Sequence, residues 1–319
     1  MGWRGDDEIL AQLASYAGAG EILILEGWES ARLPGGYAGA AVWRLDLRLR
    51  AERGDRRTQS FVVKVCRARE VEAMRLAASL GAATFPRIAA SRVAAESPDN
   101  PEASLFVSPF YAGRDLIFGD GAPVAVMRDL ARLHARFERQ ARPGWSWRID
   151  RTHAARLHAS ACDALAASAR FRATTPDHAD LLSRLGAIGP VSPLITEAED
   201  FPPTLVHGDV HPGNFILSAQ GDHTLIDWGN ACWAPAMIDL ANMVPLASPI
   251  WAAYLKAYRA AGGATPEPAL LRSWRWARGV TALMYLPWVA EFRDDAAAMT
   301  AQALEADVAL AASGPARLP

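Results

Sequence analysis

The sequence contains little cysteine: Cys66, Cys162 and Cys232 in a chain of 319 residues, with no C-x-x-C pair. An odd number of widely separated cysteines argues against a disulfide scaffold and is typical of a reducing compartment. An excess of one charge is also absent, because 33 Lys and Arg stand against 35 Asp and Glu, for a formal net charge of −2. That balance gives no electrostatic footprint for nucleic acid, so we expect no nucleic-acid partner.

Long hydrophobic runs are absent as well. The longest uncharged apolar stretch, residues 279–290, is shorter than the roughly 18 residues that a membrane span requires. Charged residues, among them Asp6 and Asp7, stand where a signal peptide would be apolar. We therefore expect a cytoplasmic protein with no membrane partner, whose oligomeric state the sequence does not predict.

The residues that are present indicate a protein of mixed strands and helices. With 51% hydrophobic residues, the chain is long enough for one large domain or two lobes. Residues 43–50 alternate strictly between apolar and charged, and residues 60–65 form a second strand-like run after a charged turn. We expect these two runs to pair as an antiparallel hairpin, followed by a helix over 69–76 and a strand over 104–108.

Beyond Pro109 the pattern becomes helical, interrupted by two short β-like runs at 214–217 and 223–227. We therefore predict an α+β protein in which residues 1–110 form a small strand-rich lobe and residues 111–319 a larger helical lobe. The segments with a helical pattern are 124–137, 153–171, 236–246, 250–261, 267–290 and 296–312.

The densest group of polar residues is the segment HGDVHPGN at 207–214, which Pro212 and Gly213 keep from being helical. Asp209 is followed five residues later by Asn214, and Asp227 comes after the next two β-like runs, in the sequence IDWG. Phosphoryl transfer from metal-bound ATP needs this set of groups. One carboxylate accepts or orients the proton of the attacking hydroxyl, while an amide oxygen and a second carboxylate hold Mg²⁺.

The spacing matches the protein-kinase pattern H-x-D-x-x-x-x-N followed by D-x-G. The alternative interpretation is a loop whose histidine and aspartate only hydrogen-bond backbone groups.

The upstream part of the chain supplies groups that could contact a nucleotide. Lys64 interrupts an apolar strand, where by itself it would be an ordinary edge-strand lysine. Glu70 opens the following helix and could fix the Lys64 ammonium toward phosphates, with Glu72 as the competitor for this role. A glycine-rich turn precedes them, and its backbone N–H groups could cover phosphate oxygens. Its glycines are Gly35, Gly36 and Gly39.

Together these residues resemble the aminoglycoside phosphotransferase and choline kinase superfamily, over about residues 20–295. The resemblance is carried by HGDVHPGN, by IDWG at 226–229 and by Asp239-Leu240-Ala241 after Pro235. It implies a bilobal protein-kinase-like fold, with a small β-rich N-terminal lobe that binds nucleotide and a larger, mainly helical C-terminal lobe that carries the catalytic loop and the acceptor site.

The resemblance also implies a role for each matching residue. Asp209 would be the catalytic carboxylate, Asn214 and Asp227 the Mg²⁺ ligands, and ATP or GTP the phosphoryl donor. Lys64 would contact the α- and β-phosphates with Glu70 behind it. The glycine turn departs from the protein-kinase form. Two further residues, His207 and His211, would support the catalytic loop.

We predict a small-molecule kinase that phosphorylates a hydroxyl of a cationic acceptor, with an aminoglycoside or related antibiotic as the first candidate and antibiotic resistance as the consequence. Acidic residues of the helical part would attract such an acceptor. Choline, homoserine and other metabolic alcohols stay open, since Trp and Tyr side chains in the C-terminal helices could cage a quaternary amine. The acidic candidates are Glu291, Asp294 and Asp295, and in a second cluster Glu197, Glu199 and Asp200.

Two further classes of protein were compared with this prediction. A catalytically inactive pseudokinase commonly lacks one of the chemical groups, whereas all of them are present here. A protein kinase would need a long activation segment and an A-P-E motif, and the sequence after Asp227 has neither.

Overall fold

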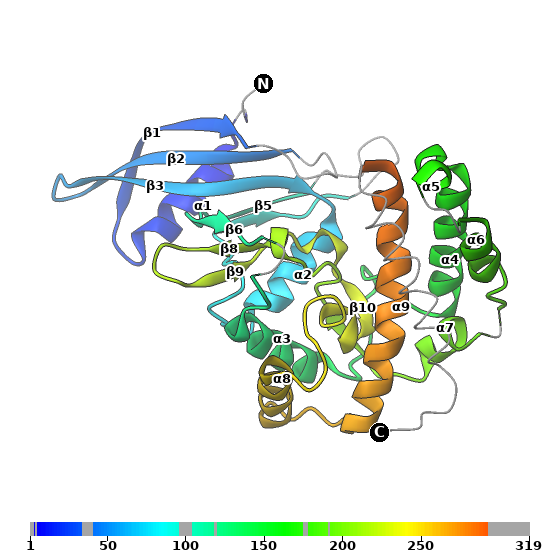
Figure 1. Ribbon diagram of the computed structural model, residues 1–319. Coiled ribbons are helices and arrows are strands. Elements are labelled where there is room, and N and C mark those ends of the chain that lie inside the picture. Colours follow the sequence, from blue (N-terminus) through cyan, green and yellow to red (C-terminus); the bar gives the residue numbers. More distant parts are fainter. Residues whose placement is uncertain are drawn as a thin grey trace. The chain divides into compact units, whose positions relative to one another are not determined.

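The computed structural model describes Trp3 and residues 5–33, 41–95, 104–117, 120–174, 178–190 and 192–292 (Figure 1). The chain forms two compact units, each made of two segments. The first unit consists of Met1–Asp120 and Pro212–Ala231, and the second of Gly121–His211 and Cys232–Pro319. This division differs from the one expected at residue 110, because a later segment of the chain returns to the first unit.

The first unit contains an antiparallel sheet of five strands in the order β1-β2-β3-β5-β4. The strands expected at 43–50, 60–65 and 104–108 are confirmed, and so is the hairpin between the first two. The strands are β1 (Leu23–Arg32), β2 (Val42–Ala51), β3 (Arg56–Cys66), β4 (Ala90–Arg92) and β5 (Ser104–Pro109).

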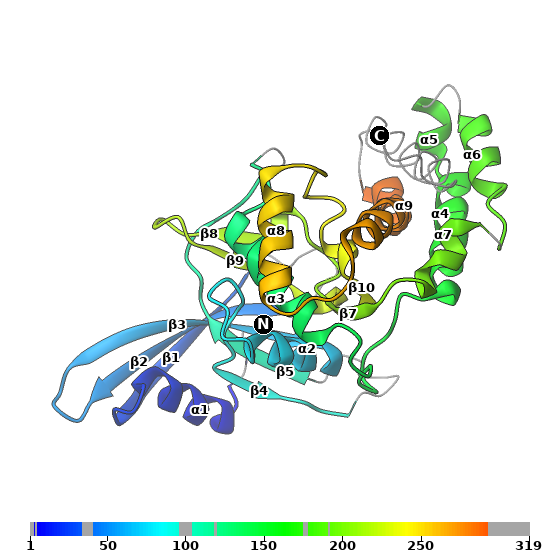
Figure 2. The same ribbon diagram turned by 90° about the horizontal axis from the view of Figure 1, so that it is seen from below.

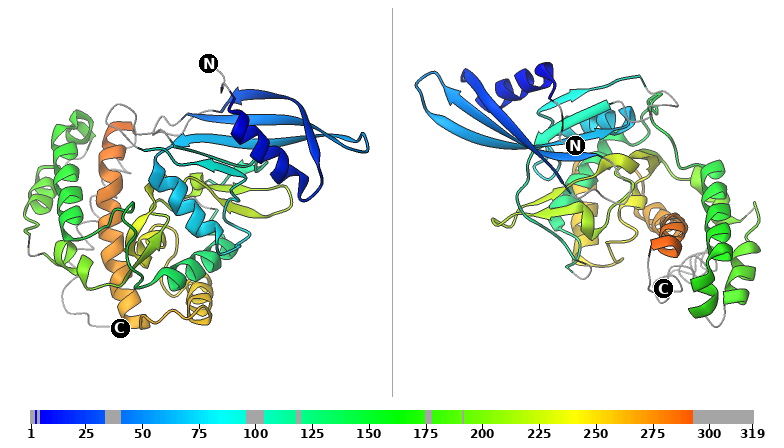
Figure 3. Two further views of the ribbon diagram at one scale, coloured as in Figure 1. Left: turned by 180° about the vertical axis from the view of Figure 1, so that it is seen from behind. Right: turned by 90° about the horizontal axis from the view of Figure 1, so that it is seen from above.

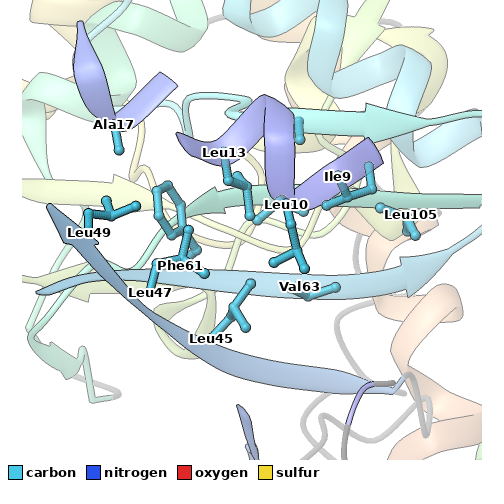
Figure 4. Packing of buried hydrophobic residues seen from close by; sticks show 12 residues of the cluster. Ile9, Leu10, Leu13, Ala17, Leu45, Leu47, Leu49, Phe61, Val63 and Leu105 are labelled. Atoms are coloured by element: carbon cyan, nitrogen blue, oxygen red, sulfur yellow. The ribbon is translucent and has the colours of Figure 1, made fainter. Parts of the chain in front are cut away.

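The core of this unit lies between the sheet and α1 (Asp7–Gly18), a helix that the sequence analysis did not predict. Leu45 and Leu47 of β2 alternate with charged residues, so they meet the helix on one face of the sheet. Leu10 and Leu13 of α1 point toward this face in Figure 4, and Figure 3 shows the helix running along the sheet. The helix begins at Asp6, whose carboxylate accepts a hydrogen bond from the backbone N–H of Ile9.

The returning segment, residues 212–231, forms the β8–β9 hairpin. In a small sheet of order β6-β8-β9, β6 (Arg114–Asp115) pairs with β8 (Phe215–Leu217), which pairs with β9 (His223–Leu225). The two β-like runs of the sequence analysis are confirmed. The hairpin belongs to the first unit because β8 pairs with β6 and the N–H of Leu225 donates to the carbonyl of Thr84 at 2.9 Å. Another helix of the unit, α2 (Ala68–Ala78), follows β3 and covers the predicted helix at 69–76.

The second unit is built mainly of helices. The helix α3 (Val124–Phe137) packs against α8 (Pro249–Ala260), and α4 (Arg151–Ala167) against α9 (Glu267–Phe292) (Figure 2). A two-stranded antiparallel ladder joins β7 (Pro203–Val206) and β10 (Cys232–Pro235). Three shorter helices follow α4: α5 (Ala169–Thr174), α6 (His178–Gly186) and α7 (Pro193–Thr196).

Two helix predictions for this unit were wrong in detail. Residues 236–246 form only a short 3-10 helix, Ala236–Asp239, followed by turns, and Pro245 near the end of this stretch has no N–H to donate to a helix. The helix expected over 153–171 is split at Ser168 into α4 and α5. The helix expected over 296–312 lies outside the described residues. In the part of the chain that is described, no helix is both long and apolar enough for a membrane span.

Candidate functional site

Lys64 lies at the centre of an ion-paired cluster in the first unit. Phe61 and Val63 are buried against α1, so the alternation of β3 turns Lys64 to the opposite face of the sheet. Its Nζ is 2.6 Å from Glu70 Oε1 and 2.8 Å from Asp227 Oδ1. Both Lys64 and Glu70 are almost inaccessible, with side-chain exposures of 11% and 5%. The lysine is therefore held by two carboxylates.

The partner of Lys64 is Glu70, and the competing Glu72 pairs with Arg75 at 2.9 Å instead. Burial alone would lower the pKa of Lys64, but the charges of Glu70 and Asp227 outweigh it and raise the pKa above its ordinary value. Burial raises the pKa of Glu70, and the Lys64 charge opposes this change. The ammonium thus remains charged over the whole physiological pH range.

The β8–β9 hairpin brings Asn214 and Asp227 to the same open end. Phe215 pairs with Leu225 in the ladder, and the N–H of Ile226 donates to the carbonyl of Asn214 at 2.8 Å. Asp227 follows directly and adopts a left-handed backbone conformation with φ of 63°. The hairpin therefore brings Asn214 and Asp227, which are separated by two strands and a turn, to neighbouring positions of the backbone.

The segment after Asp227 is fixed by its own packing. Trp228 is fully buried, packs edge-on against Phe85, and donates from its indole N–H to the carbonyl of Leu225. At Gly229 a Cβ atom would lie 3.3 Å from Asp227 Oδ1 and 3.4 Å from Glu70 Oε2. That spacing is tight, so glycine keeps room for the two carboxylates at this point of the D-x-G sequence.

The oxygen donors of this cluster fit Mg²⁺ bound together with a nucleotide. Among the residues described by the structure, no group of three or more His, Cys, Asp and Glu could hold a metal ion without other ligands. In nucleotide sites Mg²⁺ is held by one or two carboxylates, with phosphates and waters completing its coordination. The Asp227 carboxylate is 46% exposed and so accessible to such a ligand. Asn214 supplies a second oxygen at the same hairpin end.

Asp239 holds the HGD segment in the second unit. Its buried carboxylate accepts hydrogen bonds from the backbone N–H groups of His207 and Gly208, each at 2.8 Å. His134 Nε2 lies 3.0 Å from Asp239 Oδ2, and His134 Nδ1 lies 2.9 Å from the hydroxyl of Tyr254. His134 and Asp239 are completely buried, so this network fixes the backbone of the loop rather than contacting a ligand.

Asp209 follows this fixed backbone and makes contacts of its own. The hydroxyl of Tyr285, on α9, donates to Asp209 Oδ1 at 2.6 Å, and His211 Nε2 lies 3.7 Å from the same oxygen. The N–H of Asp209 donates to Nδ1 of the buried His207. A carboxylate is thereby presented at a defined orientation, next to a phenol hydroxyl and an imidazole.

Several predicted site residues remain outside this description. Gly35, Gly36, Gly39, Asp294 and Asp295 lie outside the described residues, as does the side chain of Glu291.

The acidic residues Glu197 and Asp200 of the second unit are at 4.0 and 3.1 Å from Arg272. One positive charge thus faces two negative ones, so their charge is partly compensated within the protein.

The sequence analysis missed three residues of these networks. His134 stands at helical spacing with apolar residues, so by sequence it is a core histidine, and Tyr254 carries no motif at all. Tyr285 was considered only as an aromatic side chain. A polar residue on the apolar face of a predicted helix is the signal that could have pointed to His134.

Comparison with known proteins identifies the family of the chain. The sequence profile described as the phosphotransferase enzyme family matches residues 32–279. No curated protein sequence gives a significant match.

Three solved structures illustrate the similarity. Spectinomycin phosphotransferase APH(9)-Ia, crystallised with ADP and spectinomycin, is 13% identical, with 94% of this chain and 98% of that chain covered and a TM-score of 0.54. LicA in complex with AMP is 14% identical, with 97% and 100% covered and a TM-score of 0.50; LicA from Streptococcus pneumoniae is a choline kinase. Macrolide 2'-phosphotransferase MphH from Brachybacterium faecium is 19% identical, with 98% and 100% covered and a TM-score of 0.44.

At such identities the similarity to solved structures concerns the fold alone. The fold is the protein-kinase-like one, an antiparallel five-stranded sheet followed by a largely helical region. Since the family profile spans more than half of the chain and includes both the HGD and the D-x-G segments, the chain belongs to the phosphotransferase enzyme family.

Proposed function

We propose that the protein transfers the γ-phosphoryl group of ATP or GTP to a hydroxyl of a small cationic acceptor. The observation that carries the proposal is the cluster of Lys64, Glu70 and Asp227, with Asn214 at the same hairpin end as Asp227. A buried lysine paired with a helix glutamate, beside the exposed carboxylate of Asp227, suits the binding of a metal-bound triphosphate.

Each side chain has a defined task in this proposal. Lys64 binds the α- and β-phosphates while Glu70 fixes its ammonium. Asp209 accepts the proton of the acceptor hydroxyl as the hydroxyl oxygen forms a bond to the γ-phosphorus. The bond between that phosphorus and the β,γ-bridging oxygen breaks, and the nucleoside diphosphate leaves.

Asn214 and Asp227 would hold Mg²⁺. When bound, the ion neutralises charge on the phosphate oxygens during transfer. The protein's own part is to hold these two oxygen donors at one hairpin end and to keep Lys64 charged.

A cationic acceptor, with an aminoglycoside as the first candidate, is supported by the acidic residues of the C-terminal segment, Glu291, Asp294 and Asp295. Glu197 and Asp200 support it less, because Arg272 already pairs with them. The similar spectinomycin phosphotransferase acts on an antibiotic, which makes antibiotics the first class of acceptor to test.

An aromatic cage for choline is less well supported by the helical unit. Trp251 and Trp276 are buried in helix packing. Arg278 stacks over the ring of Trp274, at 5.3 Å from its centroid. These three indoles are therefore engaged within the protein rather than free to enclose a quaternary amine.

The test measures Mg²⁺-dependent nucleotide consumption across aminoglycosides, other cationic antibiotics, macrolides, choline and homoserine, with product masses read by mass spectrometry. One added phosphoryl group on one class of acceptor would support the proposal and name the substrate. Nucleotide binding without transfer to any acceptor would favour a binding role. Absence of nucleotide binding would contradict the proposal as a whole.

Asp209→Ala should abolish transfer while nucleotide binding stays roughly intact, because the carboxylate acts on the acceptor. Asp163→Ala, at a position on α4, serves as the matched control and should transfer normally. If Asp209→Ala keeps its rate to within about tenfold, about 1.4 kcal/mol of barrier, Asp209 is not the proton acceptor.

A further inference from the structure

We propose that Tyr285 is a positioning residue for phosphoryl transfer, which holds the Asp209 carboxylate in its working orientation at the end of a hydrogen-bonded series that includes Asn242 and Thr281. The inference rests on the proposed function of Asp209. It concerns contacts within the second unit only.

The contact between Tyr285 and Asp209 is short and charge-assisted. The phenol hydroxyl donates to Oδ1 at 2.6 Å, a distance typical of a neutral O–H bonded to a carboxylate oxygen. Such bonds are about twice as strong as those between neutral groups. A carboxylate with one oxygen held in this way loses much of its freedom to rotate about the bond that joins it to Cβ.

The hydroxyl of Tyr285 is itself fixed by a further hydrogen bond. Its hydroxyl forms a hydrogen bond with the side chain of Asn242, whose Oδ1 accepts a hydrogen bond from Thr281 Oγ1 at 3.0 Å. Thr281 and Tyr285 are four residues apart on α9 and so share one face of the helix. The series therefore joins two positions of α9 to the segment that contains Asn242.

That segment also holds the loop by another route. Asn242 comes three residues after Asp239, which binds the backbone N–H groups of His207 and Gly208. The same short stretch of chain thus fixes the backbone before Asp209 and, through Tyr285, its side chain. A reaction that depends on the orientation of the Asp209 carboxylate benefits when both the backbone and the side chain are fixed in this way.

Tyr285 keeps its proton at neutral pH. Burial and the nearby charge of Asp209 raise the pKa of the phenol well above its ordinary value. The hydroxyl therefore remains a donor to Asp209 and is not a proton acceptor itself. This separates its role from that of a general base.

The test compares Tyr285→Phe with Tyr258→Phe. Tyr258 makes the same kind of bond, from a phenol to Glu138 Oε1 at 2.6 Å, at a carboxylate that has no part in the proposed chemistry. In both variants the ring stays and only the hydroxyl is lost. The readouts are kcat, KM for nucleotide and KM for the acceptor found in the panel.

We expect Tyr285→Phe to lower kcat by about tenfold to a hundredfold, as a misdirected catalytic group does, with both KM values changed by less than about twofold. Tyr258→Phe should leave kcat unchanged. An unchanged kcat in Tyr285→Phe overturns the proposal. A higher kcat also overturns it, because the phenol would then occupy the place of the acceptor hydroxyl, and a raised acceptor KM alone would make Tyr285 a binding contact.

A second measurement does not depend on activity. The urea midpoint of unfolding is compared in wild type, Tyr285→Phe, Asp209→Ala and the double variant. If the bond between the two side chains holds the carboxylate, the loss caused by Tyr285→Phe should be at least halved when Asp209 is already absent. Equal losses in the two backgrounds overturn the inference. Failure to find any acceptor would instead count against the proposed function and leave this coupling measurable.

Discussion

At the scale of single residues, Lys64 shows how much of the candidate site depends on neighbours. By sequence it is one lysine in an apolar strand, with an edge position as its simplest explanation. In the sheet, β3 lies between β2 and β5, so the edge explanation is wrong, and two carboxylates stabilise the charge. The choice between Glu70 and Glu72 could not be predicted, because both lie in the first turns of one helix and only packing decides which faces the sheet.

Glu70→Gln should lower kcat/KM for the nucleotide by at least about tenfold, or about 1.4 kcal/mol, because a neutral amide fixes the Lys64 ammonium less firmly. Glu72→Gln is the matched control, since Glu72 pairs with Arg75 on the same helix, and it should behave like wild type. Steady-state kinetics of the two variants measures the difference, and circular dichroism checks that both are folded. Equal effects of the two variants would remove Glu70 from the nucleotide site.

The roles of His134 and Tyr285 could not be predicted from the sequence either. HGD, IDWG and their spacing could be read from the sequence because each motif is local. The side chains that support these motifs come from helices far along the chain, and no local pattern marks them. A buried histidine and a partly buried tyrosine become functional candidates only when their hydrogen-bond partners are known.

At the scale of elements, the periodicity of the sequence predicted those strands and helices that bury one face. The alternation over 43–50 and the helical spacing over 124–137 were confirmed as β2 and α3. The helix α1 was missed, although Asp6 precedes it as a capping residue, and residues 236–246 were predicted as a helix that does not form. In that second case the chain beyond the short 3-10 helix makes isolated turn hydrogen bonds, such as that from the N–H of Val244 to the carbonyl of Leu240.

The end of α3 provides a pH-dependent contact. Burial would raise the pKa of Glu138, but hydrogen bonds from Thr265, Tyr258 and the N–H of Ala264 outweigh it and lower the pKa below 4.5. A carboxylate whose pKa is lower in the folded than in the unfolded state stabilises the fold above its ordinary pKa. That contribution is lost as the pH falls through the lowered value.

Glu138→Gln should therefore reduce the free energy of unfolding at neutral pH and flatten its decrease between about pH 5 and about pH 3. Urea unfolding of both proteins across that range measures the difference. Parallel curves for variant and wild type would show that Glu138 titrates alike in the folded and unfolded chain.

At the scale of the whole molecule, the division into two units was the least predictable feature. The strand-rich and helical regions follow from composition and periodicity. The return of residues 212–231 to the first unit rests on long-range contacts, among them the pairing with β6, a strand of two residues that no sequence pattern distinguishes from a loop, and the packing of Trp228 on Phe85.

Ligand binding should stabilise the molecule in a metal-dependent way. With Mg·ATP at about 100 times its Kd, mass action adds about 2.7 kcal/mol to the free energy of unfolding, seen as a higher melting temperature. EDTA should remove most of this gain. Asp227→Ala should lose it as well, whereas Asp222→Ala, in the turn of the same hairpin, should keep it. Equal stabilisation of both variants would exclude Asp227 from the metal site.

The discontinuous first unit also has a consequence for the order of events during synthesis. All five strands of its large sheet lie before residue 110, so a nascent chain carries them long before the rest is made. The sheet β6-β8-β9 must wait until residue 225 has left the ribosome, and the Asp227 partner of Lys64 emerges later still. Domains that form early can fold while translation continues. In this protein the lysine strand can fold early, but its ion-paired cluster is completed only after most of the chain has been translated.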